Sequence, residues 1–146
     1  MSRIQLALNV ADLDEAIEFY SKFFKSEPAK VRQGYANFAI EEPPLKLVLI
    51  EGEGTPGSIN HLGVEVFSTD EVTQAGTYLS SVGLETHREE ATTCCFAVQD
   101  KVWVDGVDGS PWEIYTVLGD STTAKDVGGN PCCASSSASK ATTACC

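Results

Sequence analysis

The chain has 146 residues, enough for one domain with a real hydrophobic core, and its mix of 42% hydrophobic and 21% charged residues is typical of a soluble globular protein. The net charge of −11 argues against nucleic acid or an anionic membrane as a partner, because both require clustered Lys and Arg. No apolar run is long enough to cross a bilayer and no export signal is evident, so we expect a cytoplasmic protein.

The first half of the chain predicts a strand, a helix and further strands. Residues 4–10 alternate apolar and polar side chains, which indicates a half-buried strand. A helix is expected next, since Asp12 and Glu15 form a loose version of an N-terminal capping box. Extended segments are then predicted over residues 30–40 and 45–51, separated by the turn at Pro43-Pro44.

The second half repeats this order. Residues 60–66 align with residues 4–10, and His61 falls 56 positions after Gln5. Ser68 and Glu71 form a capping box that begins a second helix. Strands are expected over residues 85–90, 95–104 and 112–118. We therefore predict an α+β fold of two tandem βαβββ modules, about residues 1–55 and 56–118, whose curled antiparallel-type sheet surrounds a metal cleft.

All six cysteines occur as adjacent pairs: Cys94–Cys95, Cys132–Cys133 and Cys145–Cys146. Neighbouring cysteines are poorly placed to staple a fold, and in a reducing compartment they suit a soft metal or metalloid. The alternative is that each acts as a small hydrophobic side chain. The last two pairs lie in residues 119–146, a Ser-, Ala-, Thr- and Gly-rich tail that we expect to be disordered. These pairs would either pass metalloid inward or be passive thiols.

Alternation also predicts which polar side chains share a cleft. Gln5 and His61 occupy equivalent positions on the first strands of the two modules, and Lys46 and Glu113 occupy equivalent positions on the last strands. An amide oxygen, an imidazole and a carboxylate would leave open positions on an octahedral ion, whereas a protonated Lys46 cannot coordinate one. Each ligand taken singly is more often an ordinary hydrogen-bonded or surface residue, but their equivalence in the repeat favours a metal site. His87 has no such equivalent and is interpreted as a solvated strand residue.

Longer motifs carry a family resemblance. They comprise residues 2–10, 34–40, 43–49, 60–66, 92–97, 99–104 and 112–118. Over about residues 1–118 the chain resembles the glyoxalase/bleomycin-resistance/extradiol-dioxygenase superfamily, also called vicinal oxygen chelate proteins. Within it, the motifs are similar to those of the subfamily that joins organoarsenical carbon–arsenic lyases to cadmium-induced proteins.

The resemblance implies a specific chemistry. The lyases of that subfamily are Fe(II)-dependent dioxygenases that use O2 to cleave trivalent organoarsenicals such as methylarsenite, releasing arsenite. The metal ligands would be Gln5, His61 and Glu113, with His61 and Glu113 also catalytic, and the substrate-binding thiols would be Cys94 and Cys95. Adjacent side chains on a regular strand point to opposite faces, so the backbone near residues 93–95 must form a loop or bulge.

Two other functions remain open at this stage. The first is a non-catalytic protein that binds cadmium or another soft ion through its thiols. The second is a glyoxalase-type isomerase or a drug-sequestering protein, which would not need the thiol pair. The sequence leaves open the organic substituent on arsenic, whether cadmium is the ligand, and whether the protein is a monomer or a homodimer.

Overall fold

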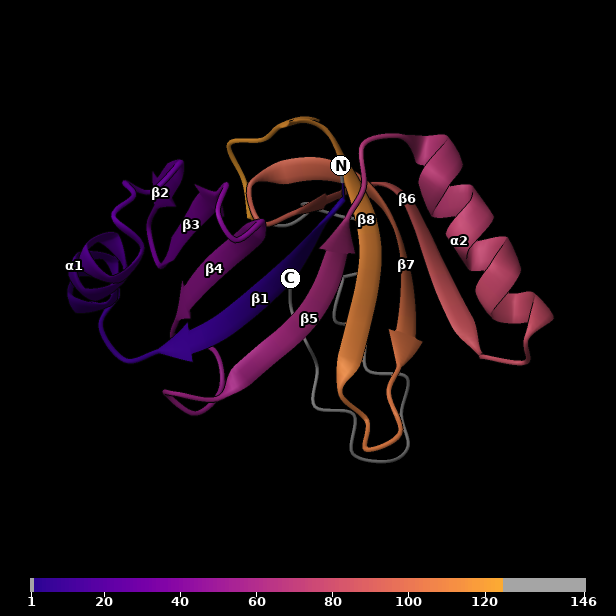
Figure 1. Cartoon of the computed structure of the whole chain (residues 1–146), viewed down its shortest axis with the longest axis horizontal. Helices are drawn as coiled ribbons and strands as arrows, with labels where there is room; N and C mark the ends of the chain where they lie inside the picture. The colour runs from indigo at the N-terminus through magenta and orange to yellow at the C-terminus, as the bar shows by residue number, and fades with distance from the viewer. Residues whose placement is uncertain (1, 125–146) are drawn as a thin grey trace. The chain divides into compact units, whose positions relative to one another are not determined.

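The structure is a computed structural model that describes residues 2–124 (Figure 1). It divides into two compact units. The N-terminal unit is Arg3–Leu62, and the C-terminal unit begins at Gly63. Strand β5 (Ile59–Glu65) contains the boundary between them. Each unit contributes one helix and a set of strands in the order that the repeat predicts, so the expected glyoxalase-type fold is confirmed.

The N-terminal unit arranges its strands in the order β2-β3-β4-β1. Strands β1 and β4 are parallel, while β2–β3 and β3–β4 are antiparallel. The parallel pair is the product of the crossover through α1, since two parallel neighbours require a long connection. The elements are β1 (Arg3–Val10), α1 (Leu13–Phe24), β2 (Lys30–Arg32), β3 (Tyr35–Ile40) and β4 (Leu45–Glu51).

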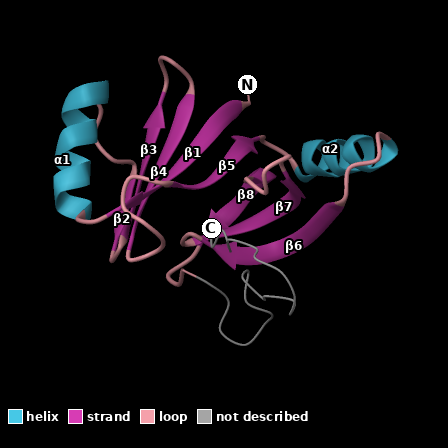
Figure 2. Cartoon of the chain, turned by 90° about the horizontal axis from the view of Figure 1, so that it is seen from below, coloured by secondary structure: helices cyan, strands magenta, loops and turns pink. Residues whose placement is uncertain are grey.

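Helix α1 begins where the capping pattern predicts. The Asp12 side chain accepts a hydrogen bond of 2.9 Å from the backbone N–H of Glu15, which satisfies one of the unpaired donors of the first turn. The helix covers one face of the strands in this unit (Figure 2). Buried side chains of the strands, among them Phe38, Leu47 and Leu49, form the core beneath it.

The C-terminal unit is an antiparallel arrangement in the order β8-β7-β6 with α2 packed against it. Ser68 caps α2 as predicted and accepts from the N–H of Glu71 at 3.2 Å. Val72 of α2 joins a buried cluster with Val66 and Val102. The elements are α2 (Thr69–Ser81), β6 (Thr86–Cys94), β7 (Ala97–Asp105) and β8 (Pro111–Asp120).

Several strand boundaries differ from the sequence-based prediction. Strand β6, expected to end at residue 90, runs to Cys94. The extended segment expected over residues 30–40 is divided by a turn at Gly34, whose φ of 72° lies in the region that glycine adopts without strain. The strand expected from residue 95 begins at Ala97, because Cys95 and Phe96 form a turn. Strand β8 runs to Asp120, two residues beyond the predicted end, since Gly119 and Asp120 pair with β7.

The remaining tail predictions lie outside the described residues. They concern Cys132, Cys133, Cys145 and Cys146 and the disorder expected beyond residue 124; at Gly119 and Asp120 the prediction of disorder is wrong, because both residues belong to β8. Within residues 2–124, no helix is long and apolar enough to cross a membrane.

Candidate metal centre and thiol pair

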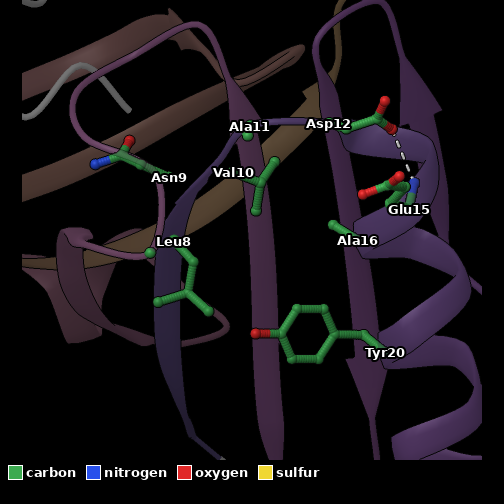
Figure 3. Close-up of a pocket in the computed structure, with 9 residues that line it drawn as sticks. Leu8, Asn9, Val10, Ala11, Asp12, Glu15, Ala16 and Tyr20 are labelled. Carbon is green, nitrogen blue, oxygen red and sulfur yellow. Dashed lines mark hydrogen bonds between the residues drawn. The ribbon is translucent and has the colours of Figure 1, made fainter.

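Strand β1 presents two chemically different faces, as its alternation predicts. Leu6, Leu8 and Val10 pack toward the core under α1. Figure 3 shows Leu8 and Val10 on the side of the Tyr20 ring, while the amide of Asn9 points away from it. The opposite face therefore carries the polar side chains.

On that polar face Gln5 meets His61. Their side chains are 5% and 1% exposed, and Gln5 Nε2 lies 3.0 Å from His61 Nε2. Lys46 is the register partner of Gln5 in the parallel β1–β4 pair. Three of the four side chains that the repeat selects thus fall within the N-terminal unit, with Gln5 beside both of the others.

Asn60 and Asn9 extend this polar cluster away from Gln5. His61 Nδ1 lies 2.8 Å from Asn60 Oδ1, and Asn60 Nδ2 donates to Asn9 Oδ1 at 3.0 Å. Asn9 Nδ2 in turn donates to Ser58 Oγ at 2.9 Å. Both ring nitrogens of His61 are therefore engaged by side chains, so the orientation of the ring is fixed from both sides.

A separate cavity of about 330 Å³ lies near the start of α1 (Figure 3). It is bordered by Leu8 and Val10, the face of β1 that turns toward the helix, and by Asp12 and Tyr20. Neither Gln5 nor His61 lines it, so this cavity does not coincide with the Gln5–His61 pair.

In the C-terminal unit Glu113 is paired with a lysine. Lys101 Nζ donates to Glu113 Oε2 at 2.8 Å, and the two residues are 1% and 2% exposed. The ammonium also lies 5.2 Å from the ring centroid of Trp103 and 6.0 Å from that of Tyr115. Burial alone would lower the pKa of Lys101, but the charges of Glu113 and of the nearby Cys95 sulfur hold this pKa above its ordinary value. Lys101 is therefore a buried cation.

A second carboxyl group lies near the same cation. Glu89 of β6 is the register partner of Lys101. Burial raises the pKa of Glu89 above its usual range, although the charge of Lys101 opposes this shift. This unit thus brings two carboxyl groups near one ammonium: Glu113 is ion-paired with Lys101, and Glu89 has a pKa that burial raises.

The thiol pair lies at the β6–β7 hairpin. Cys94 is the last residue of β6, and Cys95 and Phe96 form the turn with φ values of 53° and 59°. This left-handed turn lets neighbouring side chains approach, and the two sulfurs lie 3.8 Å apart. The non-strand backbone expected near residues 93–95 is thus present at Cys95–Phe96. Gln99 Nε2 supports the hairpin by donating to the carbonyl oxygen of Cys94 at 3.2 Å.

The redox state of the pair affects what it can bind. Cys94 is fully buried, and its sulfur is too far from that of Cys95 for the two to be bonded to each other. A soft ion binds thiolates, so both cysteines must be in the reduced state to bind one. Thiolate bonds to such ions are about 2.3 Å long. One ion bonded to both sulfurs can therefore span the 3.8 Å between them.

The chemical types of the three predicted ligands suit a divalent metal. His61 offers an imidazole nitrogen, Gln5 an amide, and Glu113 a carboxylate with one oxygen on Lys101. Among residues 2–124, no group of three or more His, Cys, Asp and Glu side chains is arranged to hold a metal ion, but the predicted set includes an amide and is not of that type. Its assembly across the two units stays a prediction.

Sequence reasoning did not assign roles to Lys101, Asn60 or Gln99. Alternation along β7 could have placed Lys101 on the face of Trp103, but its carboxylate partner depends on the β7–β8 register. His87, interpreted as solvated, is exposed and lies 3.8 Å from a Glu89 oxygen.

Comparison with known proteins gives a consistent family match. The Glyoxalase/Bleomycin resistance protein/Dioxygenase superfamily model matches residues 3–114. The chain is 62% identical over 123 residues to the cadmium-induced protein CadI of Mycobacterium tuberculosis, covering 84% of this chain and 81% of CadI. It is 57% identical over 134 residues to the trivalent organoarsenical cleaving enzyme of Thermomonospora curvata, covering 91% and 89%.

Solved structures share the fold at low sequence identity. The Mn(II)-bound glyoxalase from Novosphingobium aromaticivorans aligns with a TM-score of 0.58 and 17% identity, over 88% of this chain and 44% of that chain. The 2,3-dioxygenase LapB from Pseudomonas sp. KL28 aligns with a TM-score of 0.60 and 19% identity, over 86% and 44%. Likeness at this level of identity supports the fold alone.

Proposed function

Because the chain belongs to the Glyoxalase/Bleomycin resistance protein/Dioxygenase superfamily, we propose that it is an Fe(II)-dependent dioxygenase that cleaves the carbon–arsenic bond of trivalent organoarsenicals. The observation that carries the proposal is the Cys94–Cys95 pair, whose sulfurs lie 3.8 Å apart on a hairpin turn. The relative from Thermomonospora curvata, named for organoarsenical cleavage, supports it at 57% identity.

The thiol pair supplies recognition of arsenic. Trivalent arsenic exchanges two hydroxyl groups for two thiolates, which leaves its carbon substituent projecting from the pair. The buried ammonium of Lys101 interacts electrostatically with the Cys95 sulfur and so favours the thiolate that this exchange requires. Holding arsenic at two points also orients its bond to carbon, and orientation of this kind lowers the barrier to reaction.

The metal ligands in this proposal are Gln5, His61 and Glu113. A bound Fe(II) with open positions supplies the site at which O2 is activated. Within each unit a neighbouring side chain restrains a proposed ligand: Lys101 restrains the Glu113 carboxylate at 2.8 Å, and Asn60 restrains the ring of His61 at 2.8 Å.

The overall reaction balances without an external reductant. Methylarsenite, CH3As(OH)2, and O2 give arsenite, As(OH)3, and formaldehyde. The carbon–arsenic bond breaks, one oxygen atom ends on arsenic and the other on carbon, and arsenic stays trivalent. The methyl carbon loses four electrons, which are the four that reduce O2.

Turnover by the purified protein tests this proposal. The reduced chain is loaded with Fe(II) under argon, its iron content is measured, and methylarsenite is added in air. A phosphine is the suitable reductant, because a thiol reductant would compete for arsenic. We expect arsenite from the natural chain and none from Cys94→Ser or Cys95→Ser. Iron-containing, reduced protein that yields no arsenite would contradict the proposal.

The 62% identity to CadI favours a second candidate function, that of a soft-metal-responsive protein that binds through the same thiols without turnover. That function predicts arsenic or cadmium bound at the thiol pair with no arsenite formed. Both functions require reduced thiols and so fit the cytoplasm. The protein acts as a monomer or a homodimer in either case, which sedimentation would distinguish.

A further inference from the structure

A line of side-chain hydrogen bonds runs behind His61 within the N-terminal unit, and the proposed function does not account for its direction. It begins at His61 Nδ1, 2.8 Å from Asn60 Oδ1, and continues from Asn60 to Asn9 at 3.0 Å. From Asn9 it passes to Ser58 Oγ at 2.9 Å. It ends where Ser58 Oγ donates to the backbone carbonyl of Thr55 at 2.5 Å.

The last partner fixes the direction of every bond in this line. The carbonyl oxygen of Thr55 can only accept, so the single hydroxyl hydrogen of Ser58 is used there. Ser58 Oγ must then accept from the amide nitrogen of Asn9, which leaves Oδ1 of Asn9 to accept from the amide nitrogen of Asn60. Only the carbonyl oxygen of Asn60 remains to face His61. Nδ1 of His61 must therefore carry the hydrogen.

The opposite side of the ring leads to the same tautomer. Nε2 of His61 lies 3.0 Å from the amide nitrogen of Gln5, and an amide nitrogen can only donate. With the amide in this orientation, Nε2 presents its lone pair. The Gln5 contact agrees with this tautomer but does not fix it, because a Gln amide can present either its nitrogen or its oxygen; the line that ends on the Thr55 carbonyl fixes it.

We propose that Asn60 is the positioning residue of the metal site: it holds His61 in the Nδ1–H tautomer, so that Nε2 keeps the lone pair that a metal would bind in place of the Gln5 N–H. Only neutral imidazole nitrogen with a free lone pair can coordinate, and the other nitrogen usually needs a partner that fixes the ring. The role in metal binding rests on the proposed function. The assignment of the tautomer does not.

The line is anchored to a tight turn. The backbone N–H of Asn9 donates to the carbonyl of Ser58 at 2.9 Å, and Gly57 donates back to the carbonyl of Asn9 at 2.8 Å. Gly54, at φ 62°, packs so closely that a Cβ there would lie 2.7 Å from Asn9 Nδ2. The amide of Asn9 therefore has little room to turn, and the orientation set at Thr55 is passed on to His61.

Nitrogen NMR of the metal-free protein tests the tautomer directly. Long-range correlations between ring carbon-bound protons and nitrogens distinguish Nδ1–H from Nε2–H, and a His87→Gln background leaves His61 as the only histidine. We expect Nδ1–H in the natural chain and a shift toward Nε2–H in Asn60→Ala. Asn60→Asp retains an acceptor and should retain Nδ1–H. Asn37→Ala is the matched control, because Asn37 is a buried asparagine of the same unit that bonds to Tyr35 instead.

Two results would overturn the proposal: Nε2–H in the natural chain, or Nδ1–H unchanged in folded Asn60→Ala. If Asn60→Ala does not fold, the natural chain and Ser58→Ala decide. Ser58→Ala removes the donor to Thr55, so a mixture of tautomers supports the proposal and unchanged Nδ1–H contradicts it.

Cobalt titration of the reduced protein, without any arsenical, measures the consequence for metal binding. We expect Asn60→Ala to weaken Co(II) binding about 10- to 100-fold, with Asn60→Asp and Asn37→Ala close to the natural chain. Equal affinity in Asn60→Ala and the natural chain would contradict the positioning role. If the natural chain binds no cobalt, the proposed metal function fails, whereas the NMR comparison still decides what Asn60 does to His61. If the natural chain binds cobalt but forms no arsenite in the turnover assay, the proposed reaction fails while the inference about Asn60 still stands.

Discussion

Removing the ammonium of Lys101 should destabilise the fold severely, because its partner Glu113 would remain as a buried carboxylate that has lost the charge of Lys101. The two atoms lie 2.8 Å apart, and at an effective dielectric constant of about 20 their attraction is about 6 kcal/mol. Desolvation of both charges offsets much of that attraction when the pair is intact. When Lys101 is lost, the cost of desolvating the Glu113 carboxylate is no longer balanced by attraction to the ammonium. The free energy of unfolding then falls by about 3–5 kcal/mol.

The variants Lys101→Met and Lys101→Met/Glu113→Gln separate these contributions. We expect the single variant to lose about 3–5 kcal/mol, or on the order of 10 °C in Tm, and the double variant to recover much of it because both charges of the pair are removed. The assay is urea unfolding of reduced, metal-free protein near neutral pH, followed by the fluorescence of Trp103 and Trp112, the two tryptophans. The pKa of Lys101 is raised, so its contribution is present at this pH and is lost only as the pH rises through that pKa.

A surface pair provides the control for this experiment. Lys22 and Glu18 lie 2.6 Å apart, but both side chains are exposed to solvent. Lys22→Met should therefore change stability far less than Lys101→Met. The reasoning fails if Lys101→Met is as stable as Lys22→Met, or if the double variant is no more stable than Lys101→Met.

Two further predictions concern the supports of the two units. Asp100 accepts from Thr69 Oγ1 at 2.6 Å and from the N–H of Ala91 at 2.7 Å, and these bonds hold its pKa below the usual range. Asp100→Asn should lower the free energy of unfolding by about 1–3 kcal/mol near neutral pH. This difference in stability from the natural chain should vanish as the pH falls below about 4 and through the lowered pKa of Asp100. A difference in stability that grows in acid would contradict the prediction. Gly54→Ala should cost more stability than Gly57→Ala, because both positions have positive φ but only the Gly54 methyl meets a neighbour, Asn9; equal losses in thermal unfolding would mean that the contact has no effect.

Periodicity and repetition were sufficient to predict most of the fold. The alternation of β1, the two helix caps and the equivalence of Gln5 with His61 are local or periodic signals, and the structure contains each of them. The resemblance to the carbon–arsenic lyase and cadmium-induced subfamily is likewise confirmed by the relatives.

Other features could not be derived from the sequence, because they depend on backbone conformation or on long-range register. Cys95-Phe96 is not a residue pair that favours positive φ, so the hairpin turn between β6 and β7 has no local signal. Asn60 and His61 are neighbours on a strand, which predicts opposite faces rather than the observed contact. The burial of Lys101 becomes intelligible only once β8 brings Glu113 beside it.

The most direct test of the proposed function is the stoichiometry of the reaction. O2 consumption and arsenite formation are measured in one sealed sample of reduced, Fe(II)-loaded protein with methylarsenite. The proposed reaction requires one O2 consumed and one formaldehyde formed for each arsenite, with neither consumption nor product when Cys94 and Cys95 are both replaced by serine. Arsenite formed without O2 consumption, or O2 consumed by the iron-loaded protein without arsenite, would contradict it.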